Sequence, residues 1–289
     1  MKPEIIIHPK MNHSITLYKY ISNIALEGLI KNGDFRVTYR KDCNDPYEML
    51  PAYANPQNMF SRHNDQGFIS FSECPDNATL WGNYADKYAG ARVEFKFNYF
   101  SENDTDLNDA SMQDNVLRQH ISLLKELGFT TYYINAFYDK GILKPSIFRH
   151  FLIKCKYVKE RIKAECLFLP GGIISDEELN LQTIKEHFLL TCTKGIDWKE
   201  EKECRLLIKA PKDSYKRTLI DGNIMEFTNI PTPHIKSILL GPKSKYNIAE
   251  VESIIESQRK NIDFHRNYIP NNVKIMKANY HNYLFTLDH

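Results

Sequence analysis

The chain has 289 residues, a formal net charge of +2 and 42% hydrophobic residues. Lys and Arg number 38 against 36 Asp and Glu, so no long-range field attracts nucleic acid or an anionic membrane, and nucleic acid is a disfavoured partner. The six cysteines form no C-x-x-C pair, which indicates reduced thiols in a cytoplasmic protein. No apolar run has the length of a signal peptide or a membrane-spanning helix. We therefore expect a chain with a substantial core and no membrane partner.

The N-terminal part predicts a strand, a capped helix and a second strand. Leu17–Tyr20 is a short extended segment. Ser22 can cap a helix that ends at Gly33, because glycine suits the left-handed position after a helix. Phe35–Tyr39 alternates as a strand, and Asn44–Glu48 has the composition of a turn.

The most informative stretch contains two strand patterns with a helix pattern between them. Polar and apolar residues alternate over Phe68–Ser72 and again over Ala91–Phe97. Between them, Asp76 or Asn77 can cap a helix, because a short side-chain oxygen accepts a free N–H of the first turn. The helix is expected to end at Gly90, and residues at helical spacing form its inward face: Leu80, Trp81, Tyr84 and Tyr88.

Residues 101–154 are interpreted as a helical insert. Residues 51–65 and 101–109 are polar and lack periodicity, which is typical of loops. An apolar stripe predicts a helix over 116–128. A second helix is expected near 147–153, and a strand follows it.

The last part of the chain predicts a helix that Ser175 opens with a capping box and Gly195 closes. Trp198–Ile208 is expected to enter a single strand. The rest predicts a hairpin, a strand, a helix and terminal strands over 217–227, 235–240, 248–255 and 273–283. No internal repeat and no linker stand out. We therefore expect one α+β domain over 1–289, with a mixed, mainly antiparallel sheet flanked by helices.

A candidate site lies at Glu201-x-Glu203-x-Arg205, beside Trp198. Two carboxylates on one strand face, about 7 Å apart from the strand rise, can share a ligand. The neighbouring arginine can keep one of them ionised or bind a phosphate. For so short a motif, the commoner alternative is an exposed strand face with a salt bridge.

Ser72 and Glu73 form a second candidate site with Trp81 and Tyr84. A serine at a strand end and an aromatic helix face suit a ligand that has an aromatic ring beside a sugar hydroxyl. Packing of the two aromatic residues in the core is the default alternative.

A third pattern resembles a nuclease. Pro75-Asp76 followed by Glu94-Phe95-Lys96 has the layout in which two acids hold Mg²⁺ and a lysine steadies the attacking water. The match is degenerate, and Asp76 serves more simply as a helix cap. A basic run over 154–163 is interpreted as a solvated face, and the spacing of the histidines predicts no metal site.

Six motifs follow one another along the chain: Leu17–Tyr20, Asn44–Glu48, Phe71–Glu73, Leu80–Ala85, Gly90–Phe95 and Trp198–Arg205. In this order they resemble the motifs of the domain of unknown function 2971 family of bacterial proteins. The resemblance spans residues 17–241, with 247–289 as a C-terminal helix and strands. It implies a bacterial single-domain protein, and some relatives are linked with phage defence; it supplies no reaction. The chain departs from the family at Gly82 and in the insert.

The order of polar strand, strand ending in serine, and late strand with E-x-E is also similar, more distantly, to ADP-ribosyltransferases. That resemblance implies NAD or another nucleotide as the substrate, with no separate cofactor. Glu203 is then the catalytic carboxylate, Glu201 orients the substrate or acceptor, and Arg205 is the ion-pair partner of Glu201. The remaining residues expected to bind the substrate are Tyr18, Lys19, Tyr20, Asn44, Asp45, Glu48, Ser72, Glu73, Trp81, Tyr84 and Trp198.

Two alternatives remain open at this point. One is the Mg²⁺-dependent nuclease with Asp76, Glu94 and Lys96, and the other is a non-catalytic module that binds another protein. If Glu201, Glu203 and Arg205 pair on the wall of a cleft, we expect a site; on an open sheet face, we expect the module. The oligomeric state is not predicted.

Overall fold

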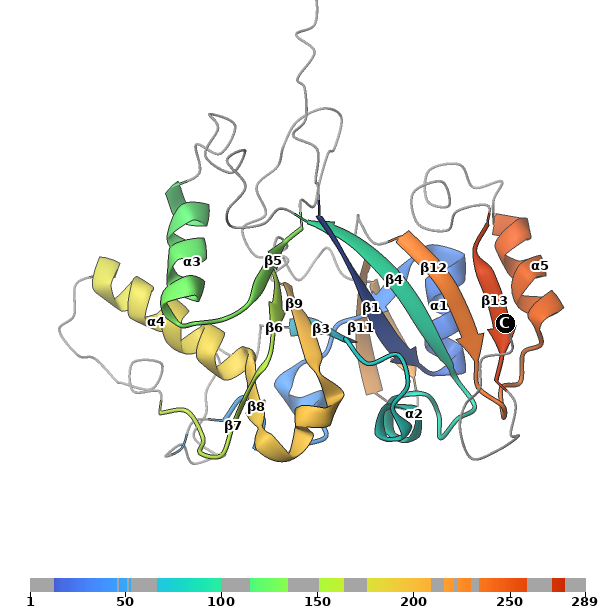
Figure 1. The fold of residues 1–289 in the computed structure, drawn as a ribbon, viewed down its shortest axis with the longest axis horizontal. Coiled ribbons are helices and arrows are strands. Elements are labelled where there is room, and N and C mark those ends of the chain that lie inside the picture. The colour runs from blue at the N-terminus through green and yellow to red at the C-terminus, as the bar shows by residue number, and fades with distance from the viewer. Residues whose placement is uncertain are drawn as a thin grey trace, which may run out of the picture.

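A long, twisted sheet crosses the molecule, with helices along its length (Figure 1). The structure is a computed structural model that describes residues 13–45, 47–50, 52, 67–99, 115–134, 151–163, 176–208, 216–220, 223–229, 234–258 and 272–278. The strands are β1 (His13–Ile21), β2 (Asp34–Arg36), β3 (Gly67–Ser72), β4 (Ala91–Tyr99), β5 (Thr131–Tyr133), β6 (Phe151–Lys154), β7 (Lys156–Val158), β8 (Thr193–Gly195), β9 (Glu203–Ile208), β10 (Lys216–Ile220), β11 (Asn223–Asn229), β12 (His234–Leu240) and β13 (Lys274–Lys277). The helices are α1 (Asn23–Asn32), α2 (Ala78–Tyr84), α3 (Asn115–Glu126), α4 (Asp176–Thr191) and α5 (Ile248–Gln258), with short 3₁₀ helices η1 (Arg40–Asp42) and η4 (Ile196–Glu201).

The main sheet has eight strands in the order β13-β12-β4-β1-β3-β9-β6-β5. Its neighbours are antiparallel except for β12 and β13, which are parallel. Two smaller sheets have the orders β10-β11-β2 and β7-β8. This confirms the predicted single α+β domain with a mixed, mainly antiparallel sheet.

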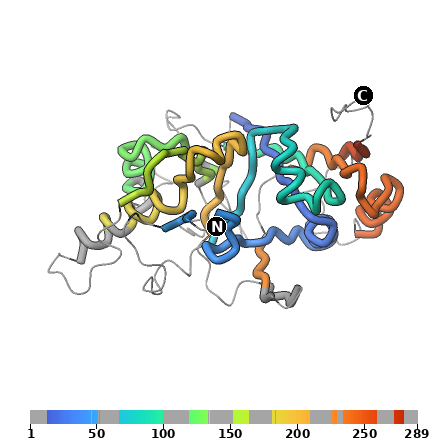
Figure 2. The backbone as a smooth tube through the Cα atoms, turned by 90° about the horizontal axis from the view of Figure 1, so that it is seen from below, coloured from blue at the N-terminus to red at the C-terminus, as the bar shows by residue number. Residues whose placement is uncertain are grey.

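The main sheet is split in the middle, between β1 and β3. Strand β1 pairs with β4 along its whole length, and β3 pairs with β9 from Gly67 to Ser72. Between β1 and β3, however, Tyr18 and Ser72 form the one registered pair in the described part of the chain. Figures 1 and 2 show the two resulting halves side by side, β13-β12-β4-β1 and β3-β9-β6-β5. Because the strands diverge from this pair, the backbone leaves room for a cavity there.

Three apolar clusters cover the two faces of the sheet. On one face, α1 and α5 pack against buried side chains of both halves, Phe71 and Phe95 among them. On the opposite face, α2 packs Trp81 beside Tyr20 of β1, while α3 and α4 pack beside Leu207 of β9. The polar residues of β3 and β9 lie between these last two clusters, because side chains alternate across a strand.

Local signals produce several elements as predicted. The Ser22 hydroxyl accepts a hydrogen bond from Ala25 N at 3.2 Å and starts α1, which Gly33 ends with φ at 68°. Asn77, rather than Asp76, caps α2 through Leu80 N at 3.1 Å. The strands β3, β4 and β12 and the helices α3 and α5 also confirm the sequence patterns.

Four predicted boundaries are wrong. Helix α2 ends at Tyr84 because the backbone turns left-handed over residues 86–88, with φ of 48°, 51° and 74°. Helix α4 ends at Thr191 instead of Gly195. Residues 151–153, expected to be helical, belong to strand β6, which pairs with both β5 and β9. Trp198–Ile208 is divided into η4 and β9 by Lys202, which is left-handed with φ at 44°.

The predicted helical insert takes part in the main sheet. Its described part contains α3, but it also contributes β5 and β6 to one half of the sheet. The predicted loops at 53–65 and 101–109 and the capping box at Ser175 lie outside the described residues. Across the described ranges, no helix combines the length and the apolar character needed to cross a membrane.

Candidate functional site

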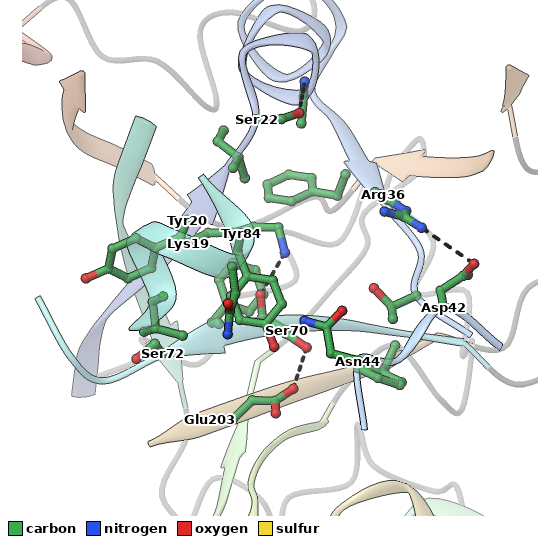
Figure 3. Close-up of a pocket in the computed structure, with 18 of the residues that line it drawn as sticks. Lys19, Tyr20, Ser22, Arg36, Asp42, Asn44, Ser70, Ser72, Tyr84 and Glu203 are labelled. Atoms are coloured by element: carbon green, nitrogen blue, oxygen red, sulfur yellow. Dashed lines mark hydrogen bonds and ion pairs between the residues drawn. The ribbon is translucent and has the colours of Figure 1, made fainter. Parts of the chain in front are cut away.

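A cavity of about 420 Å³ occupies the split between the two halves of the sheet. Consecutive residues of β1, from Tyr18 to Ile21, line it, as do Ser70 to Ser72 of β3. Because consecutive strand residues point to opposite faces, the cavity reaches both sides of the sheet at this point. The N-terminal end of α1, the turn before Glu48, helix α2 and the segment from Lys194 to Arg205 complete its wall. Figure 3 shows the side chains that converge there.

Glu203 lies at the start of β9 and is held by three neighbouring side chains. Arg205 donates to it twice, from Nε to Oε1 at 2.8 Å and from Nη2 to Oε2 at 3.1 Å. Lys194 Nζ donates to Oε2 at 2.9 Å, and the Ser70 hydroxyl donates to Oε1 (Figure 3). Glu203 is 5% exposed, so these charge-assisted hydrogen bonds offset the removal of its carboxylate from water.

Arg205 is the buried centre of this cluster. Besides Glu203, its guanidinium donates to Glu48 and to the Thr191 carbonyl oxygen. Its Cζ lies 4.0 Å from the centroid of the Phe68 ring, in cation–π geometry. Burial lowers the pKa of Arg205 to about 10, yet it stays charged at neutral pH.

Lys194, in β8, bridges the two carboxylates of the E-x-E motif. Its Nζ lies 2.6 Å from Glu201 Oε2 and 2.9 Å from Glu203 Oε2, with Glu48 Oε2 at 3.9 Å. Burial opposes its charge, but Glu203 and Glu201 together raise its pKa well above the ordinary value. The ring of Trp198 lies 5.0 Å from the same ammonium group. Lys194 is therefore a fixed positive charge between acidic side chains.

Glu201 has fewer partners than Glu203. Lys194 donates to its Oε2, and the Tyr84 hydroxyl donates to its Oε1 at 3.1 Å. Burial raises the pKa of Glu201, while Lys194 lowers it. Burial also raises the pKa of Tyr84, so the phenol remains a neutral donor at physiological pH.

The local backbone explains how Glu201 reaches the cavity although it precedes the strand. The left-handed Lys202 turns the chain between η4 and β9, so Glu201 and Glu203 approach the same ammonium group. The Ser72 hydroxyl donates to the Glu201 carbonyl oxygen at 2.6 Å and accepts from Cys74 N at 2.9 Å. Ser72 thus holds the backbone of the site.

Lys19 lies across the split, where its Nζ donates to the Ser70 carbonyl oxygen at 2.7 Å (Figure 3). The ring of Phe71 is 5.4 Å away. Burial lowers the pKa of Lys19 to about 8, while Glu203 raises it. Of the three cations Lys19, Lys194 and Arg205, Lys19 has the lowest pKa.

Most of the predicted site residues converge on the cavity. Its wall contains Tyr18, Lys19, Tyr20, Asn44, Glu48, Ser72, Tyr84, Glu201, Glu203 and Arg205. Four predicted residues do not line it: Asp45, Glu73, Trp81 and Trp198. Trp81 is fully buried against Tyr20, Glu73 pairs with Lys154 at 2.6 Å, and Trp198 lies under Lys194.

The expected pairing of Arg205 with Glu201 is wrong. Arg205 pairs with Glu203 and Glu48, and Lys194 takes the place of arginine at Glu201. The sequence did not predict Lys194 as the ion-pair partner of Glu201 and Glu203, because a single lysine near the end of a predicted helix belongs to no motif. Ser70 was also missed, although its alternation with Ser72 on β3 carries the signal.

The nuclease residues have separate partners. Asp76 pairs with Arg92 at 2.9 Å, and Glu94 accepts from the Ser237 hydroxyl at 2.6 Å. Within the part of the chain that the structure describes, no group of three or more His, Cys, Asp or Glu residues could hold a metal ion. In the basic run, Lys156 donates to the Leu127 carbonyl oxygen. None of these contacts favours a nuclease.

Comparison with known proteins gives a match to a family model. A family model described as "Protein of unknown function (DUF2971)" matches residues 80–206, from α2 into β9. No curated protein and no solved structure matches the chain. The distant resemblance to ADP-ribosyltransferases therefore stays a prediction.

Proposed function

We propose that this protein, whose residues 80–206 match the DUF2971 family model, is an enzyme that acts on NAD or a related nucleotide. In this proposal the reaction breaks the bond between the ribose and its base, and the ribose passes to water or to another acceptor. The proposal extends the order of motifs that the sequence shares with ADP-ribosyltransferases.

A single row of residues across three neighbouring strands carries the proposal. Tyr18 of β1 pairs with Ser72 of β3, and Ser72 pairs with Glu203 of β9. Directly paired residues point to the same face of a sheet, so the polar early strand, the serine strand and the E-x-E strand meet at one place. All three residues of this row line the cavity, so they lie on the wall of a cleft rather than on an open sheet face.

The chemistry of the wall suits the proposed reaction. Positive charge develops on the anomeric carbon as the base leaves, and carboxylates that are held in place stabilise it. Glu201 and Glu203 are the carboxylates that would stabilise this positive charge. Tyr18 and Tyr84 offer aromatic surface on which the base can stack. A cavity of about 420 Å³ is within the usual size range of small-molecule sites. Depletion of NAD would also fit the link with phage defence that the family resemblance implies.

Release of nicotinamide from NAD⁺ by the pure protein tests the proposal. We expect release by the wild type and its loss in the variant Glu201→Gln/Glu203→Gln. Glu200→Gln is the matched control, because Glu200 lies in the same segment with a side chain that is 73% exposed. The proposal fails if the wild type releases no nicotinamide, or if the folded double variant releases it at the wild-type rate.

A non-catalytic binding module is the second candidate, and the extent of pairing favours it. Three acids, Glu48, Glu201 and Glu203, face the two cations Lys194 and Arg205, with Lys19 nearby. A cluster that satisfies itself in this way also serves to fix a binding surface. Binding of NAD⁺ without any nicotinamide release would favour the module over the enzyme.

A further inference from the structure

The two carboxylates of the E-x-E motif differ in how many of their acceptor sites remain open. An ionised carboxylate has about four lone-pair sites. Within the described part of the chain, Glu203 accepts four hydrogen bonds, from Ser70, from Lys194 and twice from Arg205. Glu201 accepts two, from Lys194 and Tyr84. A substrate hydroxyl therefore finds a free acceptor at Glu201 and an occupied one at Glu203.

We propose that Glu201, rather than Glu203, is the catalytic carboxylate that touches the substrate, and that Lys194 is the positioning residue that holds it. This inference rests on the proposed function and reverses the roles expected from the motif. Arg205 and Ser70 then keep Glu203 in place as the second anchor of Lys194. Tyr84 holds the other oxygen of Glu201 and presents the carboxylate to the cavity.

Lys194 has the geometry of a positioning residue. It lies only seven residues before Glu201. Its Nζ is closer to Glu201 Oε2, at 2.6 Å, than to Glu203 Oε2, at 2.9 Å. Because Glu203 is fixed by Arg205, the shared ammonium group transmits that fixed position to Glu201. Without Lys194, two carboxylates would approach each other with no charge between them, and one would take up a proton.

The protonation of Glu201 responds to every charged group around it. Lys194 lowers its pKa, and so does the Tyr84 hydrogen bond, whereas burial and Glu203 raise it. Arg205 and Glu48 affect the pKa of Glu201 indirectly, because Arg205 binds Glu203 and Glu48 lies near Lys194. Removal of Lys194 is therefore expected to raise the pKa of Glu201 further. If ionised Glu201 is the working form, activity will then require a higher pH.

The experiment has two arms, and the first needs no turnover. Glutamate labelled with ¹³C at the side-chain carboxyl gives an NMR signal for each glutamate. The variants Glu201→Gln and Glu203→Gln assign two of these signals, because each variant lacks one of them. Addition of NAD⁺ is expected to shift the Glu201 signal more than the Glu203 signal. In Lys194→Met, the Glu201 signal is expected to titrate at higher pH than in the wild type, whereas Lys194→Arg should keep the wild-type value.

The second arm measures nicotinamide release against pH. Glu201→Gln is expected to lower kcat by at least about 100-fold with little change in NAD⁺ binding, and Glu203→Gln by less than about 10-fold. Lys194→Met should move the acidic limb of the profile to higher pH, and Lys194→Arg should not. If Lys194→Met does not fold, Lys194→Gln removes the same charge and takes its place, and Lys194→Arg stays the control that keeps the charge.

The outcomes separate this inference from the proposed function. Release that depends on Glu203 alone, or an NAD⁺-induced shift confined to Glu203, overturns the inference and leaves the function standing. An acidic limb and a Glu201 titration that both stay unchanged in Lys194→Met overturn the role of Lys194. If NAD⁺ shifts neither signal and no nicotinamide appears, the proposed function fails and this inference with it.

Discussion

Arg205→Met removes the cation at the centre of the buried cluster and leaves its partners in place. Glu203 keeps Ser70 and Lys194, while Glu48 keeps the more distant Lys194 Nζ at 3.9 Å. The Thr191 carbonyl oxygen also loses the guanidinium as its donor. Methionine retains an apolar stem beside Phe68, so the packing changes little compared with the charge.

The expected loss of unfolding free energy is about 4 kcal/mol. Breaking a buried ion pair by removing one partner costs about 3–5 kcal/mol, because the remaining charge stays buried without compensation. The side chain of Glu48 is only 4% exposed, so water cannot replace the arginine there without rearrangement. Against a typical total stability of about 5–15 kcal/mol, the variant should still fold while its urea midpoint falls markedly.

Equilibrium unfolding in urea, followed by tryptophan fluorescence, measures this loss, because Trp81 is fully buried. Glu200→Gln serves as the surface control and should stay within about 0.5 kcal/mol of the wild type. In Glu48→Gln/Arg205→Met the uncompensated charge is gone, so part of the loss should be recovered. A cost below about 1 kcal/mol for Arg205→Met, or no recovery in the double variant, would refute the reasoning.

Three substitutions test the packing of the sheet and the charge at the split. A Cβ on Gly90 would lie 2.0 Å from the Ile21 carbonyl oxygen, so Gly90→Ala should lower the free energy of unfolding in urea by more than about 2 kcal/mol. A Cβ on Gly82 would meet nothing within 4 Å, so Gly82→Ala in helix α2 should raise it by up to about 1 kcal/mol. Equal effects of the two substitutions would contradict this reasoning. The pKa of Lys19 falls from 10.5 to about 8, so between these values the unfolded chain binds a proton that the folded chain has released, and stability rises with pH by up to about 3 kcal/mol. Lys19→Met should abolish this rise, and a difference between wild type and variant that does not change with pH would count against it.

Several elements could be predicted because their causes are local. Ser22 and Gly33 fix the ends of α1 through hydrogen bonds and dihedral angles within one turn of the helix. The alternation in β3 and β4 follows from the opposite directions of consecutive side chains along a strand, although β3 is buried on both faces in the folded molecule. The ordered motifs along the chain also indicated a resemblance to the DUF2971 family, whose model matches residues 80–206.

Elsewhere the sequence pattern was ambiguous and the fold decided. Residues 151–153 form an apolar run too short to separate helix from strand, and pairing with β9 placed them in β6. The motif W-x-x-E-x-E-x-R suggested one continuous strand. Lys202 instead adopts a left-handed conformation, which the sequence pattern did not predict. The turn makes possible the shared contact of Glu201 and Glu203 with Lys194.

The sequence by itself determined the class of the fold and the main strands, and most of the site residues that it predicted line the cavity. Only the tertiary structure decided which charges pair. Arg205 pairs with Glu48, 157 residues away, and Lys194 takes the position that the motif assigned to Arg205. The physical reason is that helix caps and strand alternation depend on neighbours along the chain, whereas a buried ion pair depends on distance and desolvation in the folded molecule.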